Sequence, residues 1–154
     1  MSFRYAGCVL ALLAMVVVSL VAPARSSNDP WADSQTVQAA DLSKELVDPK
    51  AAPTVIFVGF ARLYTAGHIR RAQFHGTTGT DDGLTQFHNW VDALPRGANI
   101  VIYCGCCPME RCPNIRPAFA TLRDLGFTKT RVLILPGDFA KDWADKGFAY
   151  DKGQ

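Results

Sequence analysis

The sequence has no strong excess of charge of either sign, no internal repeat and no low-complexity segment. It contains 16 lysines and arginines against 14 aspartates and glutamates, so its formal net charge is +2. The basic residues form no stripe along the chain, which argues against nucleic acid as a partner. A chain of 154 residues is long enough for one domain with one sizeable core.

Beyond residue 24, cysteine is absent except in one short stretch. Of the five cysteines, one lies near the amino terminus at Cys8, and the other four fall within nine positions: Cys104, Cys106, Cys107 and Cys112. No bridge among these four can tie distant parts of a fold together, so the pattern excludes a disulfide framework. A cluster of this kind indicates a reactive site, a metal site or a local disulfide.

Residues 1–24 have the pattern of a secretory signal peptide. Arg4 precedes an almost wholly apolar run over residues 9–21, and Ala22-Pro23-Ala24 is a small-residue exit. We therefore expect cleavage after Ala24, a periplasmic or secreted mature protein, and a flexible polar segment over residues 25–33. An uncleaved membrane anchor is the alternative, although its apolar core is short for a membrane span.

Apolar, β-branched segments alternate with segments of helical spacing through the rest of the chain. We predict strands at 35–38, 54–58, 72–74, 99–103 and 131–135. We predict helices at 41–46 with Asp41 as N-cap, 59–64, 84–93, 114–125 with Asn114 as N-cap, and 139–146. We expect a tight turn at 66–69 and a loop at 75–83. This order predicts an α/β fold: an open parallel sheet covered by helices on both faces, with residues 99–103 at its centre.

The four clustered thiols fall between a predicted buried strand and a predicted helix. Cys104 directly follows the strand at 99–103, and the helix begins near Asn114. Ligands bind at such strand ends in open α/β folds, and the helix amino terminus favours negative charge. A thiol in this setting ionises more easily, and the thiolate is the nucleophile.

Several segments resemble the rhodanese-like domains. Residues 64–72, YTAGHIRRA, resemble that family's Y-x-x-G-H-I-x-x-A segment, and residues 100–104 resemble the strand that delivers its catalytic cysteine. Residues 122–127 and 137–148 resemble the end of the following helix and the family's closing pattern. The resemblance implies a rhodanese-like domain over residues 34–150. It also implies a sulfurtransferase, in which a loop cysteine takes a sulfane sulfur from a donor such as thiosulfate and passes it to a thiol or cyanide-like acceptor.

The chain departs from the family's pattern in two places. Phe57 and Gly59 stand where the family's second strand carries D-x-R, and the cysteine loop is several residues longer. Cys104 has the position of the family's nucleophile. Cys107 is the alternative, because its distance from Gly126 is closer to the family's loop-plus-helix length.

The other residues of the loop lead to further predictions. Arg111, together with Gly105 and the pair Cys106-Cys107, is expected to bind an anionic donor, with Arg116 as a second candidate. The extra thiols suit two alternatives to sulfur transfer: a thiol–disulfide module that works with a periplasmic redox protein, or a metal-binding module. The soft ligands Cys106, Cys107 and Cys112 suit Cu, Zn or an iron–sulfur cluster, although the loop lacks the paired C-x2-C of common zinc sites. We predict no other cofactor.

The aromatic and imidazole side chains outside the loop are expected to be structural. His68 should be a hydrogen-bonded, partly buried imidazole, as the resembling segment implies. His75 has no partner visible in the sequence. The tryptophans are expected to pack in the core: Trp31, Trp90 and Trp143.

Overall fold

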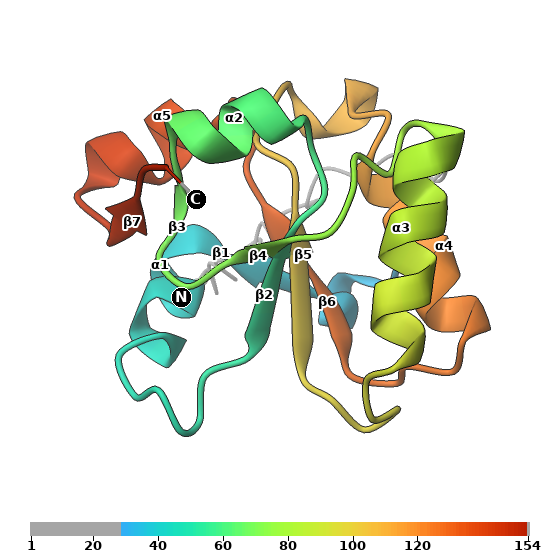
Figure 1. Ribbon diagram of the computed structural model, residues 1–154. Helices are drawn as coiled ribbons and strands as arrows, with labels where there is room; N and C mark the ends of the chain where they lie inside the picture. Colours follow the sequence, from blue (N-terminus) through green and yellow to red (C-terminus); the bar gives the residue numbers. More distant parts are fainter. Residues whose placement is uncertain (1–28, 154) are drawn as a thin grey trace, which may run out of the picture.

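A computed structural model describes residues 29–153, so the signal peptide expected over residues 1–24 lies outside the described residues. The described chain forms a five-stranded sheet in which every neighbouring pair is parallel (Figure 1). The strand order is β1-β6-β5-β2-β4, which puts β5 at the centre as predicted. The strands are β1 (Thr36–Gln38), β2 (Thr54–Phe57), β4 (Gln73–Phe74), β5 (Ile100–Tyr103) and β6 (Thr130–Ile134).

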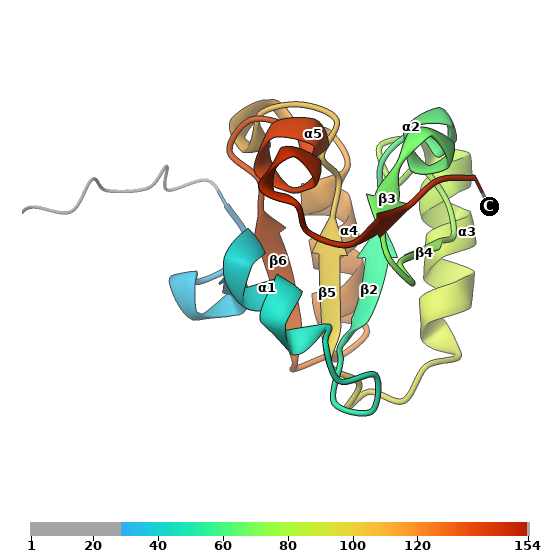
Figure 2. The same cartoon turned by 90° about the vertical axis from the view of Figure 1, so that its left-hand side faces the viewer.

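Helices cover both faces of the sheet, as the alternating pattern predicted. The helices are α1 (Ala39–Glu45), α2 (Ala61–Ala66), α3 (Asp81–Asp92), α4 (Ile115–Asp124) and α5 (Phe139–Asp142). Short 3-10 turns are η1 (Asp33–Gln35), η2 (Met109–Arg111) and η3 (Ala144–Lys146). Helices α3 and α4 lie on one face, and α1 lies on the other (Figures 1 and 2). In the described part of the chain, no helix is long and apolar enough to cross a membrane.

The central strand β5 divides its four side chains between the two faces of the sheet. Ile100 and Ile102 pack into the core under α3 and α4, while Val101 and Tyr103 pack into the core that contains α1 and Trp143. All four are fully buried. Each such apolar side chain contributes about 1.5–3 kcal/mol relative to an exposed one. The strand that carries the cysteine loop is therefore among the most firmly held elements.

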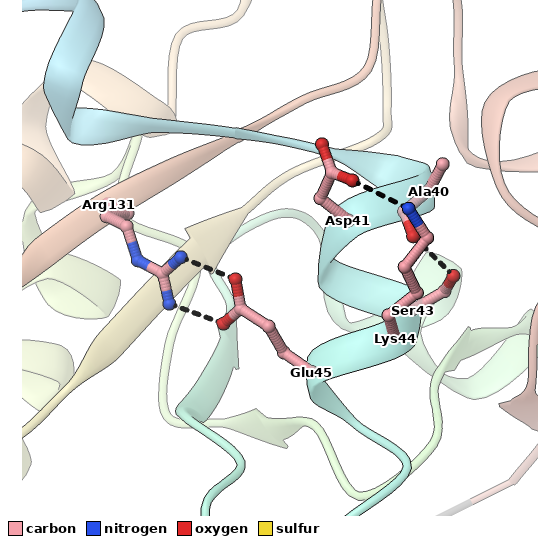
Figure 3. Close-up of polar contacts among 6 residues, drawn as sticks. All are labelled: Ala40, Asp41, Ser43, Lys44, Glu45 and Arg131. Atoms are coloured by element: carbon pink, nitrogen blue, oxygen red, sulfur yellow. Dashed lines mark hydrogen bonds and ion pairs between the residues drawn. The ribbon is translucent and has the colours of Figure 1, made fainter.

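Helix α1 is held to β6 by a two-pronged ion pair. The guanidinium of Arg131 donates to both carboxylate oxygens of Glu45, at 2.8 and 2.7 Å (Figure 3). The N-cap predicted at Asp41 is wrong, because the helix begins at Ala39 and the N-cap position is occupied by Gln38, three residues earlier. Asp41 lies in the first turn, where its charge suits the helix dipole, and it pairs with Lys44 at 3.0 Å (Figure 3).

Helix α3 begins earlier than its apolar spacing predicted. Its first residue is Asp81, so the loop predicted through residue 83 ends at the N-cap Thr80. The Thr80 hydroxyl accepts a hydrogen bond from the Gly83 backbone N–H at 3.2 Å. The Gly- and Asp-rich composition concealed this start. Gly83 is needed because a Cβ there would lie 2.2 Å from the Thr77 carbonyl oxygen.

A small antiparallel ribbon replaces the tight turn predicted at residues 66–69. Strand β3 (His68–Ile69) pairs with β7 (Tyr150–Asp151), a strand that the sequence did not reveal. Strands of two residues carry no detectable periodicity. The ribbon places residues 150–151 against residues 68–69, which follow α2. It thereby brings Lys152 to a cavity beside the cysteine loop.

The helix predicted at residues 139–146 is broken at Trp143. Its backbone angles there, φ −129° and ψ −64°, separate α5 from η3. The Trp143 side chain is fully buried, and its indole N–H donates to the Ala149 carbonyl at 3.0 Å. The sequence predicted the burial of this large ring. The helix is interrupted at the residue whose side chain is buried.

The part of segment 25–33 that the structure describes, residues 29–33, packs against α4. The Trp31 ring meets Phe119 edge-on at 5.5 Å. The guanidinium of Arg116 lies over Trp31 and forms an ion pair with Asp29 at 2.6 Å. These contacts fix the segment beside the start of α4, next to the cysteine loop.

Candidate functional site

Cys104 is positioned by the end of β5. It is 3% exposed and lies close to Gly59, where an added Cβ would stand 3.0 Å from its sulfur and 2.7 Å from the Phe57 ring. A side chain at position 59 would therefore displace the cysteine. The Phe57 ring packs edge-on against Tyr103 at 5.3 Å, so aromatic packing braces the end of β5.

Gly105 turns the chain away from the strand. Its φ of +67° lies in the left-handed region that favours glycine. Its carbonyl accepts a hydrogen bond from the Phe139 N–H at 3.1 Å, and a Cβ would lie 2.8 Å from the Phe139 Cβ. Glycine is thus required both by the backbone angle and by the close approach of α5.

The loop brings three of its four sulfurs together. The Sγ atoms of Cys104, Cys106 and Cys112 all lie within 4.8 Å of one another. Cys106 Sγ is 3.0 Å from Cys104 Sγ and also 3.0 Å from Cys107 Sγ. All four are free thiols in this structure. Cys107 is not a member of this group, but its thiol contacts Cys106 and Cys112.

Asn114 connects this cluster to the rest of the fold. It occupies the N-cap position of α4 as predicted, but its side chain makes no capping bond. Instead its amide Nδ2 lies 3.3 Å from Cys104 Sγ and 3.8 Å from Cys106 Sγ, and its Oδ1 accepts from the Gly79 N–H at 2.9 Å. The sequence placed this residue correctly and missed what it contacts.

The start of α4 favours the thiolate form of Cys112. Its pKa is lowered by a hydrogen bond from the Cys104 thiol and by the backbone N–H groups of Asn114 and Ile115, which together outweigh burial. The pKa of Cys104 is raised, first by Cys112 and then by burial. The surroundings therefore favour the thiolate form more at Cys112 than at Cys104.

A cavity of about 490 Å³ opens beside the cluster. Cys104, Gly105 and Cys106 line it, while Cys107 and Cys112 do not. Its other walls are mostly apolar, and its charged lining residues are few. They are Asp138, Asp145 and Lys152. Lys152, which follows β7, had no signal in the sequence, because only the pairing of β3 with β7 brings it here.

The two arginines considered as anion ligands differ in their surroundings. Arg111 is exposed on η2 and does not line the cavity, so its role toward an anionic donor stays a prediction. Arg116 is engaged elsewhere: it donates to the carbonyls of Met109 at 3.2 Å and Cys112 at 3.3 Å, besides its ion pair with Asp29. Arg116 holds the loop in shape, and its expected contact with an anion is replaced by these bonds.

The remaining predictions concern packing. His68 is buried, its Nδ1 lies 2.8 Å from the Tyr64 carbonyl oxygen, and its ring stacks on Tyr64 at 3.8 Å. His75 stacks on Trp90 at 3.7 Å, and burial lowers its pKa. These contacts agree with the structural roles expected for His68 and Trp90, and they give His75 a partner that the sequence did not show.

Comparison with known proteins identifies the fold. No family model matches the chain, and no curated protein matches it. The rhodanese-like domain of the Alr3790 protein from Anabaena sp., solved by NMR, is 22% identical with a TM-score of 0.55, covering 77% of this chain and 79% of that one. The BH2092 protein from Bacillus halodurans is 23% identical with a TM-score of 0.60, covering 77% of each chain. The chain therefore has the rhodanese-like fold that its motifs predicted.

Proposed function

We propose that this protein is a rhodanese-type sulfurtransferase in which Cys104 carries the sulfane sulfur. The observation that supports this most directly is the position of Cys104, at the carboxyl end of the central strand and on the wall of a cavity of about 490 Å³. The rhodanese-like fold supports the same reaction class. Cys107, the alternative nucleophile, does not line the cavity.

Cys104 must lose its proton before it can attack, and Cys112 is placed to accept it. Hydrogen bonds lower the pKa of Cys112, and the two sulfurs lie within 4.8 Å of each other. Proton transfer from Cys104 to Cys112 leaves the thiolate on Cys104 and conserves the charge of the pair. Cys112 thus acts as a general base. Its sulfur does not line the cavity, which leaves the nucleophilic role to Cys104.

The Cys104 thiolate then attacks the outer sulfur of the donor. With thiosulfate, a bond forms between Cys104 Sγ and that sulfur, the donor S–S bond breaks, and sulfite leaves with the bonding electron pair. An acceptor thiolate or cyanide next attacks the terminal sulfur of the Cys104 persulfide. The Cys104 thiolate leaves and regains its proton from Cys112, so the enzyme returns to its starting state.

Asn114 is the group best placed to stabilise negative sulfur during these steps. Its Nδ2 lies 3.3 Å from Cys104 Sγ, and its Oδ1 is held by the Gly79 N–H, so the amide is oriented before the reaction begins. A hydrogen-bond donor that is already oriented stabilises the transition state more than a mobile one, because it needs no reorganisation during the reaction. Lys152 is the basic side chain of the cavity, and it suits the anionic end of a donor.

The same site supports a thiol–disulfide reaction as a second candidate. Cys106 Sγ is 3.0 Å from Cys104 Sγ. Attack by the Cys106 thiolate on the inner sulfur of a Cys104 persulfide would form a Cys104–Cys106 disulfide and release hydrosulfide. A periplasmic dithiol protein would restore the two thiols by being oxidised in exchange. Mass spectrometry of alkylated protein after reaction with donor separates this disulfide from a stable persulfide.

The reaction is proposed to take place outside the cytoplasm. The apolar run and the Ala22-Pro23-Ala24 exit support export with cleavage after Ala24. Amino-terminal sequencing of protein recovered from the periplasm should begin at Arg25. Recovery of a chain that retains Met1 would contradict this proposal.

Thiocyanate formation from thiosulfate and cyanide tests the sulfur transfer. Cys104→Ser should abolish turnover and remove the persulfide from the loop peptide, because a serine hydroxyl does not ionise at neutral pH. Cys107→Ser, which alters the same loop outside the cavity, should retain turnover. Cys112→Ser should lower kcat more than it changes KM, because Cys112 is proposed to move a proton without touching the donor. Full turnover in Cys104→Ser, with a persulfide on Cys107, would assign the reaction to the other cysteine.

A further inference from the structure

The cysteine loop lines the cavity and also brings three of its sulfur atoms close together. Cys104 ends β5, Cys112 directly precedes the start of α4, and Cys106 lies between them, yet their three sulfurs are all within 4.8 Å of one another. The three come from both ends of the loop, so the fold brings them together. In the described part of the chain, no imidazole or carboxylate belongs to this group. It is a ligand set made of sulfur alone.

Sulfur ligands restrict the choice of metal. Thiolates select soft ions such as Cu(I), zinc and iron in iron–sulfur clusters. Structural zinc and iron–sulfur clusters take four ligands, but only three sulfurs here lie within mutual reach. Cys107 is 3.0 Å from Cys106 and yet falls outside the mutual group. Three converging sulfurs match an ion that accepts three-coordination, and among these metals Cu(I) fits best.

The surroundings of the three sulfurs suit a bound ion. Cys104 and Cys112 are 3% and 4% exposed, so water would be largely excluded from them. Cys106 is half-buried and lines the cavity, which gives an ion a route from solvent. Asn114 Nδ2 lies 3.3 Å from Cys104 Sγ and 3.8 Å from Cys106 Sγ. Such outer hydrogen bonds orient metal ligands and spread their charge.

We propose that Cys104, Cys106 and Cys112 form a three-coordinate Cu(I) site. Each sulfur binds the ion as a thiolate, so any proton that it carries is released to solvent on binding, and no atom is oxidised or reduced. The site does not depend on the proposed sulfur transfer. If both exist, they exclude each other, because Cys104 cannot hold copper and a sulfane sulfur at once; copper would then inhibit turnover.

Competition with a chromophoric Cu(I) chelator tests the site on the full chain, reduced and free of oxygen. The protein should withdraw one Cu(I) ion per chain from the chelator. X-ray absorption of the complex should show three sulfur neighbours and no oxygen or nitrogen. Zn(II), added in the same way, should bind more weakly than Cu(I).

Single serine variants identify the ligands. Loss of an outer hydrogen-bond partner already weakens metal affinity by about 10–100-fold, so Cys106→Ser and Cys112→Ser should weaken Cu(I) binding by more than about 100-fold. Glu110→Gln is the matched control, because it changes an exposed side chain of the same loop outside the cluster and should keep the parent affinity. Thermal melting of the metal-free variants shows whether each still folds.

Three results would overturn the copper site: unchanged affinity in Cys112→Ser, equal loss in Glu110→Gln, or tighter binding of zinc with four sulfur neighbours. The outcome is also separable from that of the sulfur-transfer proposal. Thiocyanate formation without copper uptake refutes the copper site and leaves sulfur transfer standing. Copper uptake without thiocyanate formation does the reverse.

Discussion

Asn114 and Gly79 are joined by a hydrogen bond of 2.9 Å, from the Gly79 N–H to the side-chain Oδ1 of Asn114, whose Nδ2 points at Cys104. The Asn114 side chain is fully buried. Gly79 must be a glycine here, because an added Cβ would lie 2.5 Å from Asn114 Oδ1. One amide therefore ties the segment before α3 to the start of α4 and to the end of β5.

Removing this amide should cost stability. Asn114→Ala leaves the Gly79 N–H without its partner, and a buried group left unpaired costs about 1–3 kcal/mol. Urea unfolding should therefore show a lower midpoint with an unchanged slope. Asn89→Ala on the exposed side of α3 is the control, and its effect should stay within about 0.5 kcal/mol. Equal stability of Asn114→Ala and parent would show that water replaces the amide.

Two buried threonines should respond oppositely to the same substitution. Thr130 Oγ1 is the one buried side-chain oxygen or nitrogen among residues 29–153 that lacks a hydrogen-bond partner. Thr130→Val should therefore raise the free energy of unfolding by about 1 kcal/mol. Thr78 Oγ1 donates to the Asn114 carbonyl at 2.6 Å, so Thr78→Val should lower it by about 1 kcal/mol or more. Thermal melting of the pair measures both, and a shift in the same direction would contradict the assignment.

Gly105→Ala should disturb both stability and the cavity. The left-handed φ of +67° costs an alanine about 1–2 kcal/mol, and its Cβ would press on Phe139, which lines the cavity. Gly97→Ala is the control, because no atom lies within 4 Å of the added Cβ and its φ is not positive. The control should be neutral or stabilising by up to about 1 kcal/mol. Equal behaviour of the two variants in urea unfolding would be inconsistent with the described turn.

The ion pair between Glu45 and Arg131 should make stability depend on pH. Its hydrogen bonds lower the pKa of Glu45 below the ordinary value of 4.5. A lowered carboxyl pKa stabilises the folded state above the unfolded value, and this contribution is lost as the pH falls through the folded value. Glu45→Gln should thus lower the free energy of unfolding near neutral pH by about 0.5–1 kcal/mol, because both side chains are partly exposed.

The difference between parent and Glu45→Gln should shrink as the pH falls below 4.5. Urea unfolding across this range measures it. Glu110→Gln, which changes an exposed glutamate on η2, is the control and should show no such convergence. A difference that stays constant down to acid pH would remove the ion pair as its source.

The sequence by itself determined the frame of the site. The apolar run at 99–103, the thiols after it and the helical spacing beyond Asn114 are local patterns, and each gives its element through the burial of its own side chains. They placed Cys104 at the end of the central strand. The motif at residues 64–72 predicted the rhodanese-like fold and a structural role for His68, which is buried.

The tertiary structure decided what each group in that frame does. The pKa of Cys112 is lowered and that of Cys104 is raised because their mutual hydrogen bond, burial and backbone N–H donors act on them unequally, which depends on positions in space. Lys152 reaches the cavity only through the pairing of His68 with Asp151, far apart in the chain. Sequence periodicity reports the buried face of one element at a time, whereas hydrogen bonds and charge depend on which elements meet, and only the folded chain fixes that.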